Sequence, residues 1–156
     1  MNLSSPAFQD GQPIPTKYAH RGVTGGQNIS IPLSWGAAPG ETQSFVLSMV
    51  DPHPIANNWV HWLAINILKT ATSLAEGASG KVMPAGSKEL YNSYGTVGYG
   101  GPQPPKGSGP HPYEVTIYAL NTEILDLSPN TSLAGFKKAL EGKVISSAKI
   151  IGIYER

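Results

Sequence analysis

Three of the four histidines lie in or beside turn-forming segments, where their rings could bind an anion or move a proton. His53 stands two residues after Asp51, and His111 stands two residues before Tyr113. Residues two apart share one face of an extended chain, so each pair is expected to point to a common site. A carboxylate beside an imidazole fixes its tautomer, and such a pocket could hold a phosphate or a carboxylate. The alternative is that each histidine is an ordinary loop or core residue whose ring bonds only to backbone.

A segment rich in glycine and proline leads into His111. Between Gly95 and Pro112, 11 of the 18 residues are Gly or Pro, so neither a helix interior nor a central strand can form there. Flexible linkers favour Ser and Gly without interspersed Pro and aromatic residues. Proline stiffens the segment, whereas glycine permits positive φ and close approach of backbone N–H groups to a ligand. We therefore expect a structured binding loop rather than a plain linker.

The composition narrows the class of protein. The chain has 156 residues with 18 Gly and 14 Pro, yet 40% are hydrophobic and the net charge is +1, which favours one folded domain over residues 1–156. The 11 basic residues form no stripe, which argues against nucleic-acid binding and against a polybasic membrane anchor. The absence of cysteine excludes disulfides, a thiol nucleophile and a Cys-based zinc site. Without a membrane-span-length apolar run or a signal-peptide pattern, we expect a cytoplasmic protein, although a mature secreted chain would look similar.

Strands must position these residues, and five segments have strand patterns: residues 29–35, 45–50, 60–67, 113–120 and 144–154. The second and third are nearly continuous apolar runs, typical of strands buried on both faces, and His61 begins the third. The fourth alternates, with Tyr113 on its apolar side. The first contains Pro32, which predicts an edge or bulged strand because proline cannot donate to a sheet ladder.

Helical signals are few. Residues 132–141 place Leu133, Phe136 and Leu140 on one face, with Thr131 or Ser132 as N-cap. A second short helix is indicated over residues 72–77. Several strands between Gly/Pro-rich loops and one late helix predict a mainly β protein, a mostly antiparallel core with peripheral helices.

Several motifs in a fixed order resemble the phosphatidylethanolamine-binding protein family, which is also called the Raf kinase inhibitor protein family. They are Pro32-Leu33-Ser34-Trp35, Thr42 with Ser44, Asp51-Pro52, His61-Trp62, Asn66-Ile67, Gly101-Pro102-x-Pro104-Pro105-x-Gly107-x-Gly109-Pro110-His111 and Tyr113. The motifs span nearly the whole chain, and its short loops look most like the bacterial and archaeal branch.

The resemblance implies a large central antiparallel sheet packed on a smaller sheet, with a helix on the C-terminal side. It also implies a small surface cavity for phosphate, acetate or a phosphoethanolamine head group. The family's ligand-binding positions fall on Asp51, His61, Gly101, His111 and Tyr113, and the rim on Trp59, Pro102 and Pro104. In this interpretation the two imidazoles, the loop N–H groups and the Tyr113 hydroxyl donate to the anion, while Asp51 orients an imidazole or receives an ammonium group.

Two departures from the family pattern bear on the ligand. The family usually has Asp-Pro-Asp followed by Ala-Pro, whereas this chain has Asp51-Pro52-His53-Pro54, so His53 replaces the second pocket carboxylate. The usual His-Arg-Tyr is here His111-Pro112-Tyr113, which lacks the basic side chain. Both changes weaken the expectation of a cationic ethanolamine and favour a purely anionic ligand.

We therefore expect a non-enzymatic binding or regulatory protein without catalytic residues, metal or cofactor. The expected partners are a small anion and a kinase or serine protease, and a homodimer stays open. One alternative is serine-protease inhibition through a rigid exposed segment. Another is an enzyme in which Asp51, His61 and His111 bind a metal or act as acid and base, although no Gly-x-Ser-x-Gly, P-loop or His-Glu-x-x-His motif occurs.

Overall fold

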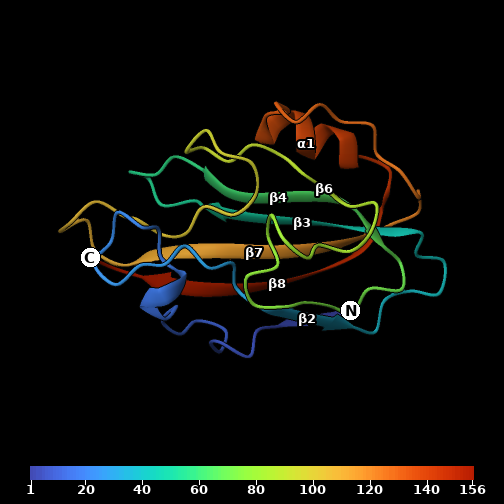
Figure 1. Cartoon of the computed structure of the whole chain (residues 1–156). Helices are drawn as coiled ribbons and strands as arrows, with labels where there is room; N and C mark the ends of the chain where they lie inside the picture. The colour runs from blue at the N-terminus through green and yellow to red at the C-terminus, as the bar shows by residue number, and fades with distance from the viewer.

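Two antiparallel β-sheets and one α-helix make up the computed structural model, which describes residues 1–156 (Figure 1). The larger sheet has the strand order β6-β4-β3-β7-β8 and the smaller the order β1-β2-β5. The strands of the larger sheet are β3 (Ser44–Asp51), β4 (Trp59–Leu68), β6 (Lys88–Glu89), β7 (His111–Leu120) and β8 (Val144–Tyr154). Those of the smaller sheet are β1 (Asn2–Ser4), β2 (Leu33–Gly36) and β5 (Ser73–Leu74). The mainly β prediction is confirmed, as are the four predicted strands of the larger sheet to within two residues at each end.

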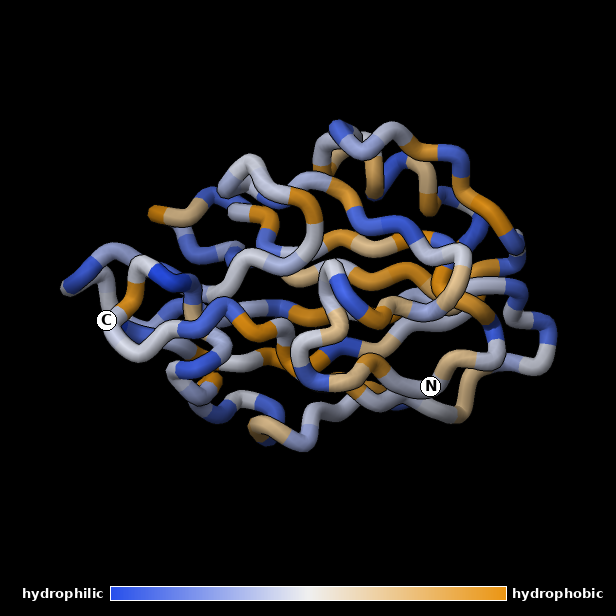
Figure 2. The backbone as a smooth tube through the Cα atoms, in the orientation of Figure 1, coloured by the Kyte–Doolittle hydropathy of each residue, from blue (hydrophilic) through white to orange (hydrophobic).

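Hydrophobic side chains from both sheets form one core between them. Leu33 and Trp35 of β2 belong to the same buried cluster as Phe45 and Leu47 of β3. The inward face of β7 is the one that the alternation predicts, because its buried residues include Tyr113, Val115, Ile117 and Ala119. Figure 2 shows hydrophobic residues concentrated along the central strands and hydrophilic ones along the outer loops.

The helix α1 (Leu133–Leu140) covers part of the opposite face of the larger sheet (Figure 1). Phe136 and Leu140 are its buried residues, and they share a second core cluster with strand residues such as Val46. Ser132 caps the helix, because its hydroxyl accepts a hydrogen bond from the Gly135 N–H at 3.0 Å. No helix in the structure has the length and hydropathy needed to cross a membrane.

Two predicted elements are wrong in detail. Residues 72–77 contain strand β5 instead of a helix, because Leu74 pairs with Leu33 of β2 and that pairing outweighs a weak local helical preference. The predicted strand at 29–35 begins only at Leu33 and lies in the middle of the small sheet, between β1 and β5, instead of at an edge. Pro32 precedes the strand, so its missing N–H removes no ladder bond. Besides α1, the structure has one short 3₁₀ turn, η1 (Thr16–Tyr18).

The antiparallel pairing of β3 with both its neighbours assembles the polar residues. The register pairs Asp51 with Trp59 of β4 and Val50 with Glu114 of β7. The last residue of β3 therefore lies beside the first residues of β4 and β7, where His61 and His111 are found. Residues far apart in the sequence meet at this end of the sheet.

Candidate anion-binding site

A cavity of about 400 Å³ lies at the end of the larger sheet where β3 stops and β4 and β7 begin. The loop after β3, the loop before β7 and Tyr94 complete its wall. The residues that line it are Asp51, Ile55, Ala56, Trp59, His61, Tyr94, Gln103, Pro104, Pro105, His111 and Tyr113. Four of these form its floor: the buried polar residues Asp51, His61 and His111, and Tyr113, which belongs to the hydrophobic core but carries a hydroxyl.

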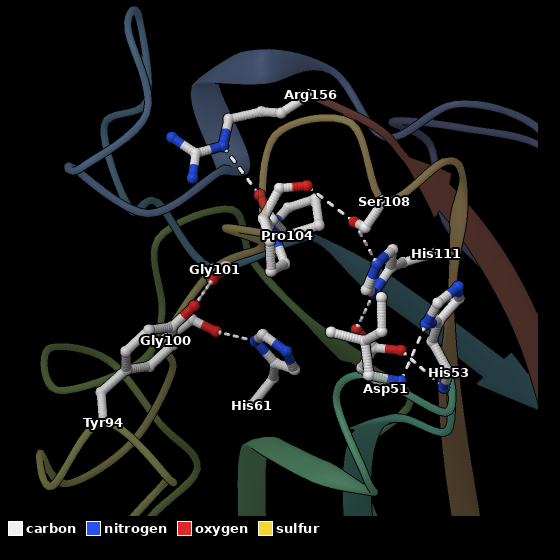
Figure 3. A network of polar contacts seen from close by, with 12 residues as sticks. Asp51, His53, His61, Tyr94, Gly100, Gly101, Pro104, Ser108, His111 and Arg156 are labelled. Carbon is white, nitrogen blue, oxygen red and sulfur yellow. Dashed lines mark hydrogen bonds and ion pairs between the residues drawn. The ribbon is translucent and has the colours of Figure 1, made fainter.

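Asp51 and His111 form a buried pair in the floor (Figure 3). The Oδ2 atom of Asp51 lies 2.6 Å from Nδ1 of His111, and the two residues are 2% and 0% exposed. An ionised carboxylate only accepts hydrogen bonds, so the His111 Nδ1 carries a proton. The other carboxylate oxygen accepts from the backbone N–H of His53 at 2.9 Å, which holds the Asp51 side chain in place.

Ser108 fixes the opposite side of the His111 ring. Its Oγ lies 2.8 Å from Nε2 of His111 and 2.6 Å from the carbonyl oxygen of Pro105. A carbonyl can only accept, so the Ser108 hydroxyl donates its proton to Pro105, and its oxygen contacts Nε2 of His111. Both ring nitrogens of His111 are therefore engaged by the protein, Nδ1 by Asp51 and Nε2 by Ser108.

The distances among Asp51, His111 and Ser108 match those of a serine hydrolase triad, but the direction of hydrogen bonding does not. In a triad the serine hydroxyl donates to the imidazole, which then removes its proton. Here the hydroxyl donates away from the ring, and Ser108 does not line the cavity. The arrangement suits fixing the position of His111 better than activating Ser108.

His61 faces the cavity as a neutral ring. Its Nδ1 donates to the carbonyl oxygen of Gly100 at 2.6 Å, so the neutral ring carries no proton on Nε2. Burial lowers its pKa from 6.5 to about 4, against the opposing effects of the Gly100 bond and of Asp51. The ring packs edge-on against Tyr113 and Tyr94, with centroid distances of 5.0 and 5.8 Å. At neutral pH His61 therefore offers the cavity a hydrogen-bond acceptor.

Two tyrosines border His61, and only one of their hydroxyls is free to donate a hydrogen bond to a ligand. The Tyr94 hydroxyl donates to the Gly101 carbonyl at 2.7 Å, whereas the Tyr113 hydroxyl has no hydrogen-bond partner in the protein. Burial raises the pKa of both hydroxyls, so both stay protonated at neutral pH. Tyr113 is thus the floor residue with a free proton donor.

The Gly/Pro-rich loop is ordered by bonds to distant segments. Gly101 donates its N–H to Asn28 Oδ1 at 2.7 Å, and a Cβ at Gly101 would lie 2.1 Å from the Tyr18 carbonyl oxygen. Only glycine therefore fits there. Arg156 fastens the other half, because its Nε donates to Pro104 O at 2.8 Å and its carbonyl accepts from Gly107 at 3.0 Å (Figure 3). The segment is a structured wall of the cavity.

Six of the nine predicted site residues line the cavity: Asp51, Trp59, His61, Pro104, His111 and Tyr113. The other three support it from behind. His53 stacks on His111 with ring centroids 3.8 Å apart, and Pro102 uses its carbonyl to accept from the His20 N–H. The expectation that loop N–H groups point to a ligand fails at Gly100 and Gly101, because the protein itself bonds both. The expectation of two donating imidazoles also fails, since His61 is an acceptor and both His111 nitrogens are engaged.

The sequence interpretation missed several contributors: Ile55, Ala56, Tyr94, Gln103 and Pro105 in the lining, and Ser108 and Arg156 behind it. Tyr94 lies in a turn held by the Asn92 side chain, whose Oδ1 accepts from the Tyr94 N–H at 3.0 Å. An Asn two residues before an aromatic in a Gly-rich stretch is a turn signal, but it does not say which surface the aromatic meets.

Comparison with known proteins gives consistent results over the full length. A family model described as phosphatidylethanolamine-binding protein matches residues 4–155. A UPF0098 protein of Methanothermobacter thermautotrophicus is 44% identical, covering 100% of this chain and 99% of that protein. The UPF0098 protein YbcL of Escherichia coli is 34% identical over 98% of this chain and 86% of that protein. The crystal structure of YbcL, described as a new member of the mammalian PEBP family, matches with a TM-score of 0.93 and 33% identity over 99% of this chain and 98% of that one.

Proposed function

Because the chain belongs to the phosphatidylethanolamine-binding protein family, we propose that it is a non-enzymatic binding protein that holds a small anionic group in the cavity between His61 and His111. The observation that carries the proposal is the buried polar floor of that cavity. The Tyr113 hydroxyl and the His61 Nε2 are not bonded by the protein, and both residues line the cavity, so these polar atoms are open to a ligand there.

The bonding of Ser108 supports binding over catalysis. A hydrolase would need the hydroxyl to donate to His111, and its oxygen to face a substrate. Ser108 instead donates to Pro105 from behind the cavity wall. We assign His111, Asp51 and Ser108 to shaping the floor.

A phosphate or carboxylate would be held by the donors that remain at the cavity. These are the Tyr113 hydroxyl in the floor, with the side chains of Gln103 and Trp59 at the wall. The same pocket could receive a phosphorylated segment of a partner protein, and a kinase is then the candidate partner.

A ¹H–¹⁵N and histidine-selective NMR titration with inorganic phosphate and with O-phosphoethanolamine tests the proposal. We expect shifts at His61 and Tyr113 and at the loop before β7. Tyr113→Phe removes one hydroxyl and should weaken binding about tenfold, the effect of one hydrogen bond to a charged group. Tyr118→Phe is the matched control, because Tyr118 lies on the same strand but packs in the core beneath α1. No shift at millimolar ligand would reject the proposal.

His111→Ala is a poorer probe of binding. It would leave the Asp51 carboxylate buried without its partner, and loss of one member of a buried pair costs about 3–5 kcal/mol. Lost binding in that variant could reflect unfolding, whereas Tyr113→Phe leaves the pair intact.

One exposed segment favours protease inhibition as a second candidate. The loop after β3 presents Ile55 with 61% of its surface exposed at the cavity mouth, and the Ile55 N–H donates to His53 Nδ1 at 3.2 Å. A rigid loop with an exposed apolar side chain is the form that a protease-binding segment needs. Titration of chymotrypsin- and elastase-like proteases tests it, and undiminished protease activity at a tenfold excess of this protein rejects it.

A further inference from the structure

The face of the larger sheet that α1 partly covers carries two buried hydroxyl side chains that the protein leaves unused. Ser48 of β3 and Thr116 of β7 stand directly opposite each other in the strand register, and they are 5% and 6% exposed. Their neighbours Met49 and Val115 belong to the core between the two sheets, so these two side chains point to the other face. Neither hydroxyl has a hydrogen-bond partner within the protein, and both residues line a small cavity there. The one sealed side-chain polar atom without a partner is Nε1 of Trp35, so the two hydroxyls are open to that cavity.

The cavity measures about 140 Å³ and lies between α1 and the strands β3 and β7. The residues that line it are Ser48, Val50, Pro52, Asn58, Glu114, Thr116, Tyr118, Leu133, Phe136, Lys137 and Lys149. None of them lines the cavity at the end of the sheet, because successive residues of a strand point to opposite faces. Asp51 and Tyr113 line that cavity, whereas the adjacent Val50 and Glu114 line this one. The volume is large enough for several water molecules or for one small ligand.

The charges around this cavity leave one cation without a partner. Nζ of Lys149 donates to Oε2 of Glu114 at 2.7 Å, so these two opposite charges balance. Lys137 of α1 also lines the cavity, and it takes part in none of the ion pairs of the protein. The cavity therefore combines two unbonded hydroxyls with one free ammonium group, and each of these groups can donate a hydrogen bond. A ligand with a single negative charge matches that set.

We propose that this cavity is a second binding site and that it takes a small monocarboxylate such as acetate or propionate. Directly opposite residues of an antiparallel pair have Cβ atoms about 4.5–5.5 Å apart, so Ser48 and Thr116 can each donate to one oxygen of the same carboxylate. Lys137 supplies the counter-charge. A second negative charge on the ligand would meet the Glu114 carboxylate, which disfavours dicarboxylates and phosphate dianions. The proposal does not depend on the function proposed for the other cavity, because the two share no lining residue.

Hydroxyls kept for a ligand contribute no hydrogen bond to the stability of the fold. Ser48→Ala and Thr116→Val remove the two hydroxyls while the apolar part of each side chain remains. Without carboxylate present, both variants should unfold at the same urea concentration as the wild type or at a higher one. A clear fall in the midpoint would show that the hydroxyls stabilise the sheet instead, and it would contradict the proposal.

A ¹H–¹⁵N and methyl-selective NMR titration of the whole chain with sodium acetate, at pH 7 and constant ionic strength, tests for binding. We expect saturable shifts at the amides of Ser48 and Lys137 and at the Thr116 methyl group. The apparent Kd should lie in the millimolar range, because so small a ligand makes few contacts. Acetamide has the same shape without the charge and should bind at least about tenfold more weakly. Equal binding of acetate and acetamide would contradict selection of an anion, and no saturable shift would mean that only water fills the cavity.

Variants assign the binding to this cavity. Ser48→Ala and Thr116→Val should each weaken acetate binding about tenfold, the loss of one hydrogen bond to a charged group. Lys137→Gln should weaken it by up to about fivefold, since the ammonium group is exposed to water. Ser147→Ala and Lys138→Gln are the matched controls, because both side chains are exposed and neither lines the cavity. Unchanged affinity in the first three variants would overturn the proposal.

The two cavities give separate signals in the same titration. Tyr113→Phe should leave the acetate shift of the Thr116 methyl group unchanged, because Tyr113 lines only the cavity at the end of the sheet. Saturable shifts confined to His61 and Tyr113 would place acetate in that cavity alone. The second site would then fail while the proposed function stands.

The carboxylate could belong to a free acid or to an acidic side chain of a partner protein. N-acetylglutamate N-methylamide presents the same group on a peptide backbone and distinguishes the two sources. Binding of acetate without binding of the peptide compound supports a free acid. Comparable shifts at Ser48 and Thr116 with both compounds support an acidic side chain that enters the cavity from a partner.

Discussion

The neutral His61 ring should make the stability of the fold depend on pH in a defined window. Burial lowers its pKa from 6.5 to about 4, so the folded state holds the proton less tightly than the unfolded chain does. As the pH falls below 6.5 the unfolded chain takes up this proton first. The contribution of His61 is therefore full above pH 6.5 and is lost progressively down to about pH 4.

The size of this effect follows from the pKa difference. A difference of about 2.5 corresponds to about 3 kcal/mol, at 1.36 kcal/mol for each pKa unit. His61→Asn removes the titrating ring while an amide N–H remains for Gly100. Since the other ionisable groups are common to both proteins, the difference between their pH profiles isolates His61.

Urea unfolding of the wild type and of His61→Asn at pH 7.5 and pH 4.5 measures the effect. The wild type should lose between about 2 and 3 kcal/mol more than the variant over this interval, with unchanged m-values. A histidine-selective NMR titration should show His61 still neutral at pH 5.5. The reasoning is refuted if His61 titrates near 6.5, or if the two proteins lose stability in parallel.

Three further substitutions test how the site and the cores are held. Asp51→Asn removes the buried carboxylate that pairs with His111 and should lower the free energy of unfolding by about 3–5 kcal/mol in urea titrations. Gly101→Ala drives a Cβ to 2.1 Å from the Tyr18 carbonyl and should cost about 1–3 kcal/mol, with NMR shifts along the loop before β7. Phe136→Ala empties the core beneath α1 and should cost about 3–5 kcal/mol by thermal or urea unfolding.

Each of these substitutions has a control of the same chemical type. Asp126→Asn and Val144→Ala change exposed side chains, and Gly40→Ala places a Cβ where no atom lies within 4 Å. All three should change stability by no more than about 0.5 kcal/mol. An Asp51→Asn cost as small as that of its control would mean that the buried pair contributes nothing. The same comparison applies to the other two pairs.

The sequence predicts the strands of the larger sheet well because their signals are local. The apolar runs of β3 and β4, the alternation of β7 and the capped face of α1 can each be read within ten residues. The short strand β5 could not be predicted, since two residues form a strand only because β2 lies beside them. Element type follows from local periodicity, and pairing partners do not.

For the site, the residue types were predictable and the proton positions were not. The motif resemblance places Asp51, His61 and His111 at one cavity, and the structure confirms that they line it. Whether each imidazole donates or accepts depends on Gly100 and on Ser108, which meet the rings only in the folded chain. No pattern within the sequence specifies those contacts.

Hydrogen bonds from Arg156 hold the cavity wall in place, and their position in the sequence affects the order in which the wall forms during translation. Arg156, two residues after the end of β8, bonds to Pro104 and Gly107 of the wall segment between Gly95 and Pro112. On the ribosome, the loop and β7 emerge well before Arg156 does. The hydrogen bonds that Arg156 makes to Pro104 and Gly107 can therefore form only after residue 156 has left the exit tunnel.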